Sequence, residues 1–425
     1  MRAFAVTVLA AAFAVTLLPG PWGDESVTDL LLYRSYADLF LDGSLPYRDV
    51  AFEYPPLAAP LLALPGVVGS GDASYRLAFG AIALALTVVL VLLLGSLARR
   101  TGGDPRRAML AGAVAPLFTG AMLRTHFDLA PMVLTLGALL ALVSNRPRAG
   151  LALLGAGVMT KGFPVVVAPV ALAWLVAQGR RREAVEGAAA LALVVIAVAG
   201  AAAALSPSGA GDAVTYHLDR PAQVESAPAM VLLGLDGLGA GRADIVHSHR
   251  SEGVEHPLSA AGVALFAGVL IAVVALMTAG AARKSGVPNG GARPAGPPGD
   301  SSARALVLAA LGAVAAFAAF GKVLSPQFLI WVVPLAVLAF AWQMPAVATA
   351  AAAAVALTLV EFPAHYGDVV QREPAALWLV GVRDVVLGLA VALVARELFL
   401  RGAPARGSAS SRWRSRQGRP RPAPR

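Results

Sequence analysis

An acidic and aromatic stretch near the N-terminus is the first place where this sequence could do chemistry. Residues 28–65 contain five carboxyl groups among several tyrosines, whereas most of the remaining chain is alanine, valine and leucine. Apolar periodicity over residues 29–41 predicts a helix with one apolar face, and Asp29 stands at its electropositive N-terminal end. A carboxylate there could act as a general base if it faces a cavity, or it could only cap the helix. Helix physics alone leaves both alternatives open.

The composition is that of an integral membrane protein. Of the 425 residues, 58% are hydrophobic and 14% are charged, against ~25% charged in a typical soluble domain. Several apolar runs reach the ~18 residues that a membrane-spanning helix needs, and their pattern is helical. We therefore expect an all-α polytopic bundle with about twelve (roughly 10–13) transmembrane helices. The chain has no cysteine, which excludes disulfides, thiolate nucleophiles and cysteine-ligated metals.

The apolar runs are expected to form one transmembrane domain over residues 1–400. Helices are expected at 1–18, 76–98, 108–123, 128–144, 149–160, 163–177, 184–205, 258–280, 304–320, 327–343, 345–360 and 375–400. Three connections are expected to be a first outer loop at 21–75, a long polar outer loop at 206–257 and a Pro/Gly-rich cytoplasmic linker at 281–303. Residues 401–425 form a basic tail, expected to be disordered and cytoplasmic.

The distribution of charge predicts how this domain lies in the membrane. Lysine and arginine gather at alternate helix ends, so the positive-inside rule places both termini in the cytoplasm. Most acidic residues and all six histidines fall on the opposite side, which makes the extracytoplasmic face of the plasma membrane the expected place for chemistry. Residues 1–18 also fit a cleavable signal peptide, but residues 17–21 make a poor cleavage site, so we expect a retained first helix.

Five stretches of the chain resemble glycosyltransferase family 87. The longest, Asp29 to Leu57, reads D-L-x-x-Y-x-x-Y-A-x-x-F-x-x-G-x-x-P-Y-x-D-x-x-F-E-Y-P-P-L. Three others are LRTHFDLAP (123–131), MTKGFPVVVAP (159–169) and LSPQFLIWVVP (324–334), and YHLDRPAQVES (216–226) is similar to actinobacterial members in particular. The resemblance implies a GT-C-class membrane enzyme that takes mannose or another sugar from a polyprenyl-phosphate donor.

The same resemblance implies roles for individual residues. It makes Asp29 the base that deprotonates the acceptor hydroxyl in an inverting transfer. Because the leaving polyprenyl phosphate is an anion, cations are expected beside it. The candidates are Lys161, Arg383, Arg220 and Lys322. Lys161 lies between two short apolar segments, and Arg383 with Asp384 is an ionisable pair inside the last helix. For each cation, the alternative is a structural ion pair or a side chain that reaches towards the membrane surface.

Further residues are candidates for contact with the sugar or the acceptor. They are Tyr33, Tyr47, Glu53, Tyr54, His126, Asp128 and Gln327. Glu53 and Tyr54 could instead hold their loop in place, and Asp128 could instead cap a helix. A metal site at His247, His249 and His256 has little support, because no carboxylate or cysteine stands at ligand spacing. We expect no metal and no other cofactor, and no glycine-rich nucleotide loop is present.

The expected function is transfer of a sugar, with mannose as the expected one, from a polyprenyl-phosphate donor. The acceptor would be a glycolipid or a cell-envelope polysaccharide on the extracytoplasmic face. Two other functions remain open: a transporter or flippase of lipid-linked intermediates, and a non-catalytic family member that acts as a membrane scaffold. The expected partners are the donor, the acceptor and membrane lipids, without nucleic acid. The concentration of charge in the outer loops favours an enzyme over a transporter, which should carry charges near mid-membrane.

Overall fold

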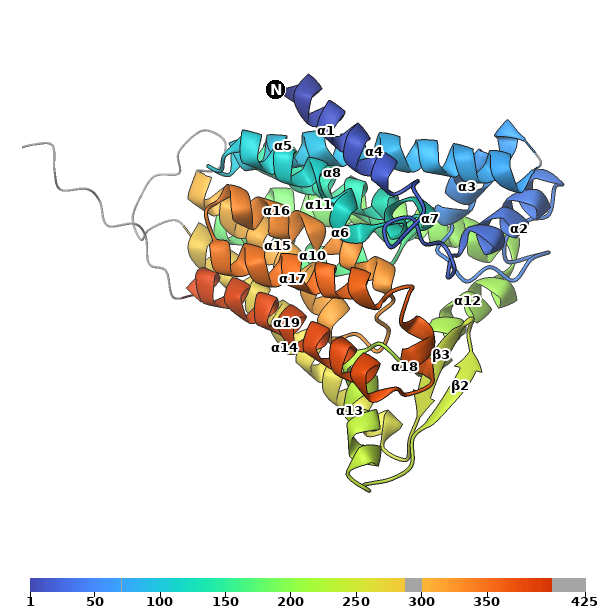
Figure 1. Ribbon diagram of the computed structural model, residues 1–425. Coiled ribbons are helices and arrows are strands. Elements are labelled where there is room, and N and C mark those ends of the chain that lie inside the picture. The colour runs from blue at the N-terminus through green and yellow to red at the C-terminus, as the bar shows by residue number, and fades with distance from the viewer. Residues whose placement is uncertain (70, 287–299, 400–425) are drawn as a thin grey trace, which may run out of the picture.

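The protein is mostly helical (Figure 1) in the computed structural model, which describes residues 1–69, 71–286 and 300–399. Within these residues, five helices are long and apolar enough to cross a membrane: α4 (Asp72–Arg100), α11 (Arg181–Leu205), α14 (Ser259–Ser285), α15 (Asp300–Phe320) and α19 (Pro374–Phe399). Shorter helices accompany them: α1 (Arg2–Val15), α5 (Pro105–Ala113), α8 (Leu129–Val143), α9 (Pro147–Thr160), α10 (Val167–Ala177), α16 (Val333–Ala341) and α17 (Pro345–Glu361). The expectation of a polytopic helical membrane protein is confirmed.

Helix α15 lies at the centre of the bundle. Of its most apolar 18 residues 83% are buried, compared with 6% in the corresponding stretches of α11 and α14, whose surfaces therefore face outwards to lipid. Its many alanines and Gly312 permit close packing, because small residues let helix backbones approach each other. A Cβ atom at Gly312 would lie 2.7 Å from a methyl of Val394 and 3.0 Å from the sulfur of Met277. The core thus depends on small side chains in α15.

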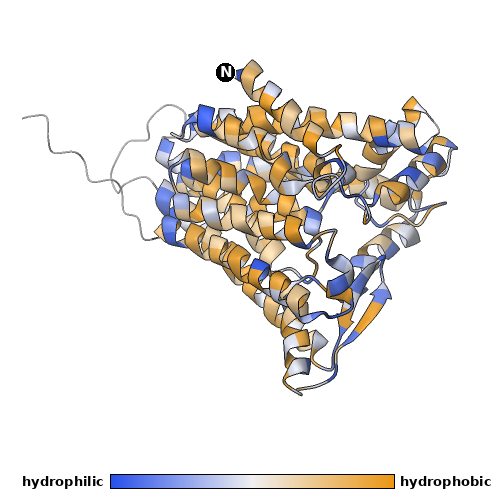
Figure 2. Cartoon of the chain, in the orientation of Figure 1, coloured by the Kyte–Doolittle hydropathy of each residue, from blue (hydrophilic) through white to orange (hydrophobic). Residues whose placement is uncertain are grey.

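The two ends of the bundle differ in character. Hydrophobic residues fill its middle, and hydrophilic residues collect at the ends (Figure 2). At one end, which we call the arginine end, Arg304 donates to the carbonyls of Thr101 and Gly102, and Arg180 donates to the side chain of Asn145. The basic helix ends predicted to be cytoplasmic therefore meet there. Most of the predicted Pro/Gly linker (287–299) and the whole basic tail lie outside the described residues.

The opposite end, which we call the loop end, carries the elements between the long helices (Figure 1). They are α2 (Leu30–Leu41), α3 (Ala58–Ala63), η1 (Leu64–Val68), α12 (Pro207–Asp219), β1 (Ala222–Gln223), α13 (Ala227–Gly237), β2 (Asp244–Ser248), β3 (Ser251–Glu255) and α18 (Tyr366–Val370). The strands form an antiparallel sheet in the order β1-β3-β2, with Gln223 opposite Gly253. The predicted polar loop at 206–257 is therefore largely ordered into helices and strands. Ser206 and Ser226 begin its two helices by accepting hydrogen bonds from Gly209 N and Ala229 N.

Several helices break near the loop end. The single helix predicted at 108–123 is wrong: α5 is followed by two short helices, α6 (Pro116–Thr119) and α7 (Met122–Thr125). Pro116 cannot continue α5, and Gly120 adopts a φ of 55° that favours glycine. Likewise α9 and α10 are separated by η2 (Phe163–Val166), and η3 (Pro326–Trp331) precedes α16. Non-helical backbone at such depth is tolerated where it lines a cavity.

Candidate active site

A cavity of about 630 Å³ opens where the loop-end elements meet these helix breaks. Its wall is formed by segments from residue 27 to residue 366, so it draws on most of the chain. It is lined by eight of the residues that the sequence singled out: Asp29, Glu53, Tyr54, His126, Lys161, Arg220, Lys322 and Gln327. The remaining four candidates, Tyr33, Tyr47, Asp128 and Arg383, do not line it.

Asp29 turns its carboxylate towards the cavity. The residue is the N-cap of α2, yet its side chain makes no capping hydrogen bond. Thr28 takes part in that role instead, because its hydroxyl accepts from Leu30 N at 3.3 Å. Oδ2 of Asp29 accepts from the Tyr33 hydroxyl at 3.0 Å and lies 3.6 Å from Nε2 of His126. With 36% of the side chain exposed, the carboxylate is accessible to a ligand, and the capping alternative loses its support.

Tyr33 holds Asp29 from behind the cavity wall. Its ring is fully buried and packs edge-on against Phe127 at 5.6 Å and stacks on Phe79 at 5.8 Å. Burial raises the pKa of the Tyr33 phenol, and the charge of Asp29 raises it further. The hydroxyl therefore keeps its proton and remains a hydrogen-bond donor to the carboxylate. Tyr33 orients Asp29 rather than contacting a ligand directly.

Lys161 is paired with Asp128 inside an aromatic enclosure. Its ammonium lies 2.7 Å from Oδ1 of Asp128, which also accepts from Nε1 of Trp331 at 2.8 Å. The ammonium is within 4.8 Å of the Phe127 ring centre and 5.6 Å of that of Trp331, distances typical of cation–π contact. Asp128 is fully buried and makes no capping bond, so it neither touches the cavity nor caps α8. Its charge largely neutralises that of Lys161.

Among the described residues, neither Arg220 nor Lys322 forms a salt bridge with a carboxylate, although the charge of Asp219 acts on Lys322. Arg220 donates from Nε to Ser251 Oγ and from Nη2 to Gln223 Oε1, both at 3.1 Å. Lys322 donates to the backbone carbonyls of Leu218 and Arg220, each at 2.7 Å. Burial lowers the pKa of Lys322, and the nearby charge of Arg220 lowers it further. The two cations thus form a positive wall, fixed to neutral partners, that suits an anionic ligand.

Glu53 and its neighbours fasten the first outer loop to the rest of the loop end. Glu53 accepts a hydrogen bond from the Tyr36 hydroxyl, and its carboxylate lies 3.6 Å from the guanidinium of Arg250. Its backbone carbonyl accepts from Nε2 of His217 at 2.8 Å. Tyr47 donates to the carbonyl of Tyr54 at 2.6 Å. These contacts match the alternative in which this segment holds its loop in place, although Glu53 and Tyr54 also line the cavity.

Arg383 forms a buried ion pair and is not part of the cavity wall. Its Nε lies 2.9 Å from Oδ1 of Asp384, and its Nη2 donates to the carbonyl of Glu225 at 2.7 Å. The side chain is 1% exposed, so the expected contact with a donor phosphate has no geometric support. Arg383 instead supports Glu225, which does line the cavity. The structural alternative considered for this residue is the one that fits.

Sequence reasoning missed several residues of the wall. Gln223, Glu225 and Tyr216 lie in the family-like stretch 216–226, and Trp331 lies in 324–334, so those motifs already pointed to them. Arg250 carried no such signal, because it depends on the turn between β2 and β3. Gln327 lines the cavity as expected, from the first turn of η3. Across the described residues, no group of three or more histidines and carboxylates is placed to hold a metal ion.

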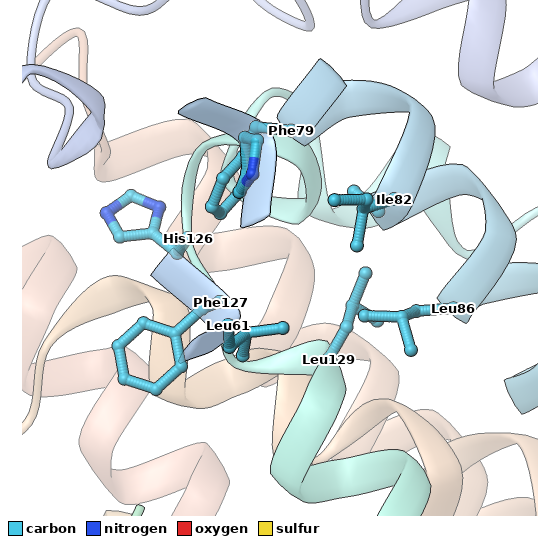
Figure 3. Close-up of a pocket in the computed structure, with 9 residues that line it drawn as sticks. Leu61, Phe79, Ile82, Leu86, His126, Phe127 and Leu129 are labelled. Atoms are coloured by element: carbon cyan, nitrogen blue, oxygen red, sulfur yellow. The ribbon is translucent and has the colours of Figure 1, made fainter. Parts of the chain in front are cut away.

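A second, small pocket lies behind His126. It has a volume of about 10 Å³ and an apolar lining that includes Phe79, Ile82, Leu86 and Leu129. Figure 3 shows the imidazole of His126 turned away from the aliphatic side chains of Ile82, Leu86 and Leu129. His126 therefore stands between an apolar crevice and the large cavity.

Comparison with known proteins assigns the chain. Residues 52–293 match the model of glycosyltransferase family 87. No curated protein and no solved structure matches the chain. The matched range includes His126, Lys161 and Arg220 of the cavity wall, whereas Asp29 and Lys322 lie outside it. Because the match spans more than half of the chain, this membrane glycosyltransferase belongs to glycosyltransferase family 87.

Proposed function

We propose that the protein moves a hexose, in the first place mannose, from a polyprenyl-phosphate donor to an acceptor hydroxyl with inversion. The acceptor is a glycolipid or a cell-envelope polysaccharide, and the reaction takes place on the extracytoplasmic face of the plasma membrane. The bundle would be of the GT-C type with about twelve transmembrane helices. One observation carries the proposal: one cavity presents the Asp29 carboxylate together with the cations Arg220 and Lys322, neither of which forms a salt bridge among the described residues.

Each side of the cavity suits one half of this reaction. A carboxylate beside the attacking hydroxyl can take its proton as the new bond to the sugar forms. The leaving phosphate gains negative charge at the same time, and fixed cations stabilise that charge in the transition state. Arg220 and Lys322 are therefore proposed as the principal phosphate ligands. Lys161 is proposed as a third phosphate ligand, whose charge is partly neutralised by Asp128. Gln327, Tyr54 and His126 are proposed as contacts to the sugar or the acceptor.

The substitution Asp29→Asn tests the assignment. Asparagine keeps the size and the hydrogen bond from Tyr33 but cannot take a proton, so transfer from polyprenyl-phosphate mannose in isolated membranes should fall at least about 100-fold. Asp42→Asn, at the exposed end of α2 and outside the cavity, is the matched control and should keep full activity. If Asp29→Asn transfers sugar as fast as the wild type at equal expression, Asp29 is not the general base. A wild type that moves the lipid without transferring sugar would indicate a flippase.

A further inference from the structure

We propose that His126 works with Asp29 as a proton couple, in which Asp29 takes the proton of the acceptor hydroxyl and His126 holds it until the product leaves. This inference rests on the proposed function and adds a proton-relay residue to it. The two side chains both line the cavity, and Nε2 of His126 lies 3.6 Å from Oδ2 of Asp29. The distance between these two atoms is too long for a hydrogen bond in the resting state. It is the shortest distance between the imidazole and the carboxylate that is proposed as the base.

The partners of Nδ1 decide where the imidazole carries its hydrogen. Nδ1 of His126 lies 2.9 Å from Oγ1 of Thr125 and 3.4 Å from the carbonyl of Met122. The Thr125 hydroxyl donates its own hydrogen to the carbonyl of Ala121 at 3.0 Å. Both neighbours of Nδ1 are thus left as acceptors, which assigns the hydrogen of the neutral ring to Nδ1. Nε2 consequently presents a lone pair towards Asp29.

Two acceptors therefore face each other until a proton arrives. The carboxylate Oδ2 and the Nε2 lone pair repel in the resting state, and a proton between them turns this repulsion into a charge-assisted hydrogen bond. Tyr33 also donates to Oδ2, but burial raises the pKa of its phenol, so it keeps its hydrogen and does not compete for the proton. A proton can therefore be accepted between Oδ2 of Asp29 and Nε2 of His126, and the proposed reaction supplies one.

The proton balance of the step is complete. The acceptor O–H bond breaks as its oxygen bonds to the sugar's anomeric carbon, and the bond from that carbon to the phosphate oxygen breaks with its electron pair leaving on polyprenyl phosphate. The proton passes to Asp29 and then to Nε2 of His126, leaving a carboxylate and an imidazolium. An imidazole nitrogen is in general a stronger base than a carboxylate oxygen, so the proton comes to rest on the ring. When the product leaves, water in the cavity recovers the proton through Asp29.

The surroundings of the ring confine this exchange to the cavity side. His126 is 3% exposed, and the crevice behind it is apolar and too small for more than about one water molecule (Figure 3). Titratable groups nearby among the described residues include the half-buried phenol of Tyr54, the Lys161–Asp128 pair, which is neutral overall, and Arg124, which is paired with Glu25. The Asp29 carboxylate, 3.6 Å from Nε2, would stabilise an imidazolium at His126.

The kinetic test compares His126→Asn with the wild type in membranes, using polyprenyl-phosphate mannose, glucose and galactose as donors. The side-chain amide of asparagine can replace Nδ1 against Thr125 but offers nothing in place of Nε2. We expect the maximal rate to fall about 100-fold with the donor KM unchanged. We also expect the acidic limb of the rate profile to move, because Asp29 then works without the imidazole. His247→Asn, on the exposed strand β2 outside the cavity, should change neither quantity.

Two measurements separate this proposal from simple structural damage and from failure of the proposed function. An acidic limb that stays in place in His126→Asn would overturn the couple, whereas equal loss at every pH would mark a structural role and also overturn it. NMR of the purified full chain with ¹⁵N-labelled histidine, assigned by comparison with His126→Asn, should show the Nδ1–H tautomer for His126. An Nε2–H tautomer overturns the couple even if transfer is normal. No transfer by the wild type from any of the three donors overturns the proposed function, whatever the tautomer.

Discussion

At the scale of single residues, the pairing of Lys161 with Asp128 sets the electrostatics of the cavity. Asp128 is fully buried and offers Oδ1 to both Lys161 and Trp331, while its Oδ2 has no hydrogen-bond partner. Removing water from a carboxylate is costly, and among the described residues Lys161 is the cation paired with it. Lys161 is thus needed for the fold as well as for any contact with the donor, and its loss would have two separate effects.

Replacing Lys161 by methionine should therefore destabilise the protein. Methionine keeps the length of the side chain but leaves Asp128 as an uncompensated buried charge, which costs about 3–5 kcal/mol. Denaturant unfolding in detergent measures the loss. The double variant Lys161→Met with Asp128→Asn removes both charges and should recover most of the stability. If the single and double variants are equally unstable, charge compensation is not what Lys161 provides.

Arg220 is predicted to matter for donor binding rather than for stability. Hydrogen bonds to a charged group contribute about 1.5–3 kcal/mol, so Arg220→Gln should raise the donor KM roughly 10-fold to 100-fold. The KM for the acceptor should stay the same, because Asp29 and not Arg220 stands beside it. Arg242→Gln, an exposed arginine outside the cavity, serves as the control. An unchanged donor KM in Arg220→Gln would contradict the placement of the phosphate.

At the scale of elements, the turn between β1 and α13 joins the cavity to the buried charges of the bundle. Glu225 in this turn accepts from Nε2 of Gln223 at 3.0 Å, and the charge of Glu361, at the end of α17, acts on its carboxyl. Arg383 of α19 holds the backbone of the same turn. The turn is therefore fastened to α19, and the hairpin β2–β3 is fastened to α2 by the hydrogen bond from Arg250 to the Tyr36 hydroxyl at 2.9 Å.

Glu225 makes the stability of this junction depend on pH. Burial raises the pKa of Glu225 well above its ordinary value of 4.5, and the charge of Glu361 raises it further. A raised carboxyl pKa means that the folded chain binds more protons than the unfolded one, so stability is complete below about pH 4.5 and is lost as the pH rises through the raised value. Melting temperatures should fall with rising pH, and Glu225→Gln should flatten that slope.

The exposed Glu255→Gln at the end of β3 is the matched control for this measurement, and it should retain the wild-type slope. A Glu225→Gln variant that loses stability with pH as steeply as the wild type would show that the carboxyl is not the group responsible.

The elements also show what can be predicted from the sequence. Predicted spans such as 184–205 and 375–400 match α11 and α19 closely. A long apolar segment in a membrane must satisfy its own backbone hydrogen bonds, and a helix does so. The break at Pro116 and Gly120 was missed because the surrounding residues remain apolar on both sides. The strand pairing of Gln223 with Gly253 was missed because it depends on contacts 30 residues apart, which composition does not reveal.

The candidate site was predicted in part for a similar reason. Polar residues such as Asp29, His126 and Gln327 stand out in an apolar chain, and each of them does line the cavity. The sequence does not indicate which polar residues pair with each other. Lys161 meets Asp128 across 33 residues, and Arg383 meets Glu225 across 158 residues, so both pairings come from the folded bundle alone.

At the scale of the whole molecule, the proposed topology places the loop end outside the cell and the arginine end inside. The absence of cysteine makes it directly testable, because one introduced thiol is the only one present. In intact cells, a membrane-impermeant maleimide should label Asp212→Cys on the exposed face of α12. It should label Arg182→Cys, at the exposed start of α11, only after the membrane is opened. The reverse pattern would invert the topology.

The spread of the cavity wall along the chain has a consequence for the timing of biosynthesis. Val27 near one end of the sequence and Tyr366 near the other both contribute to it. At about 5–20 residues per second, the ribosome needs tens of seconds to make the intervening chain. In the proposed topology, Asp29 has already been translocated during that interval, but η3 and α18 do not yet exist. The nascent protein thus passes through membrane insertion without a closed site, and it acquires one only when its last third docks against its first.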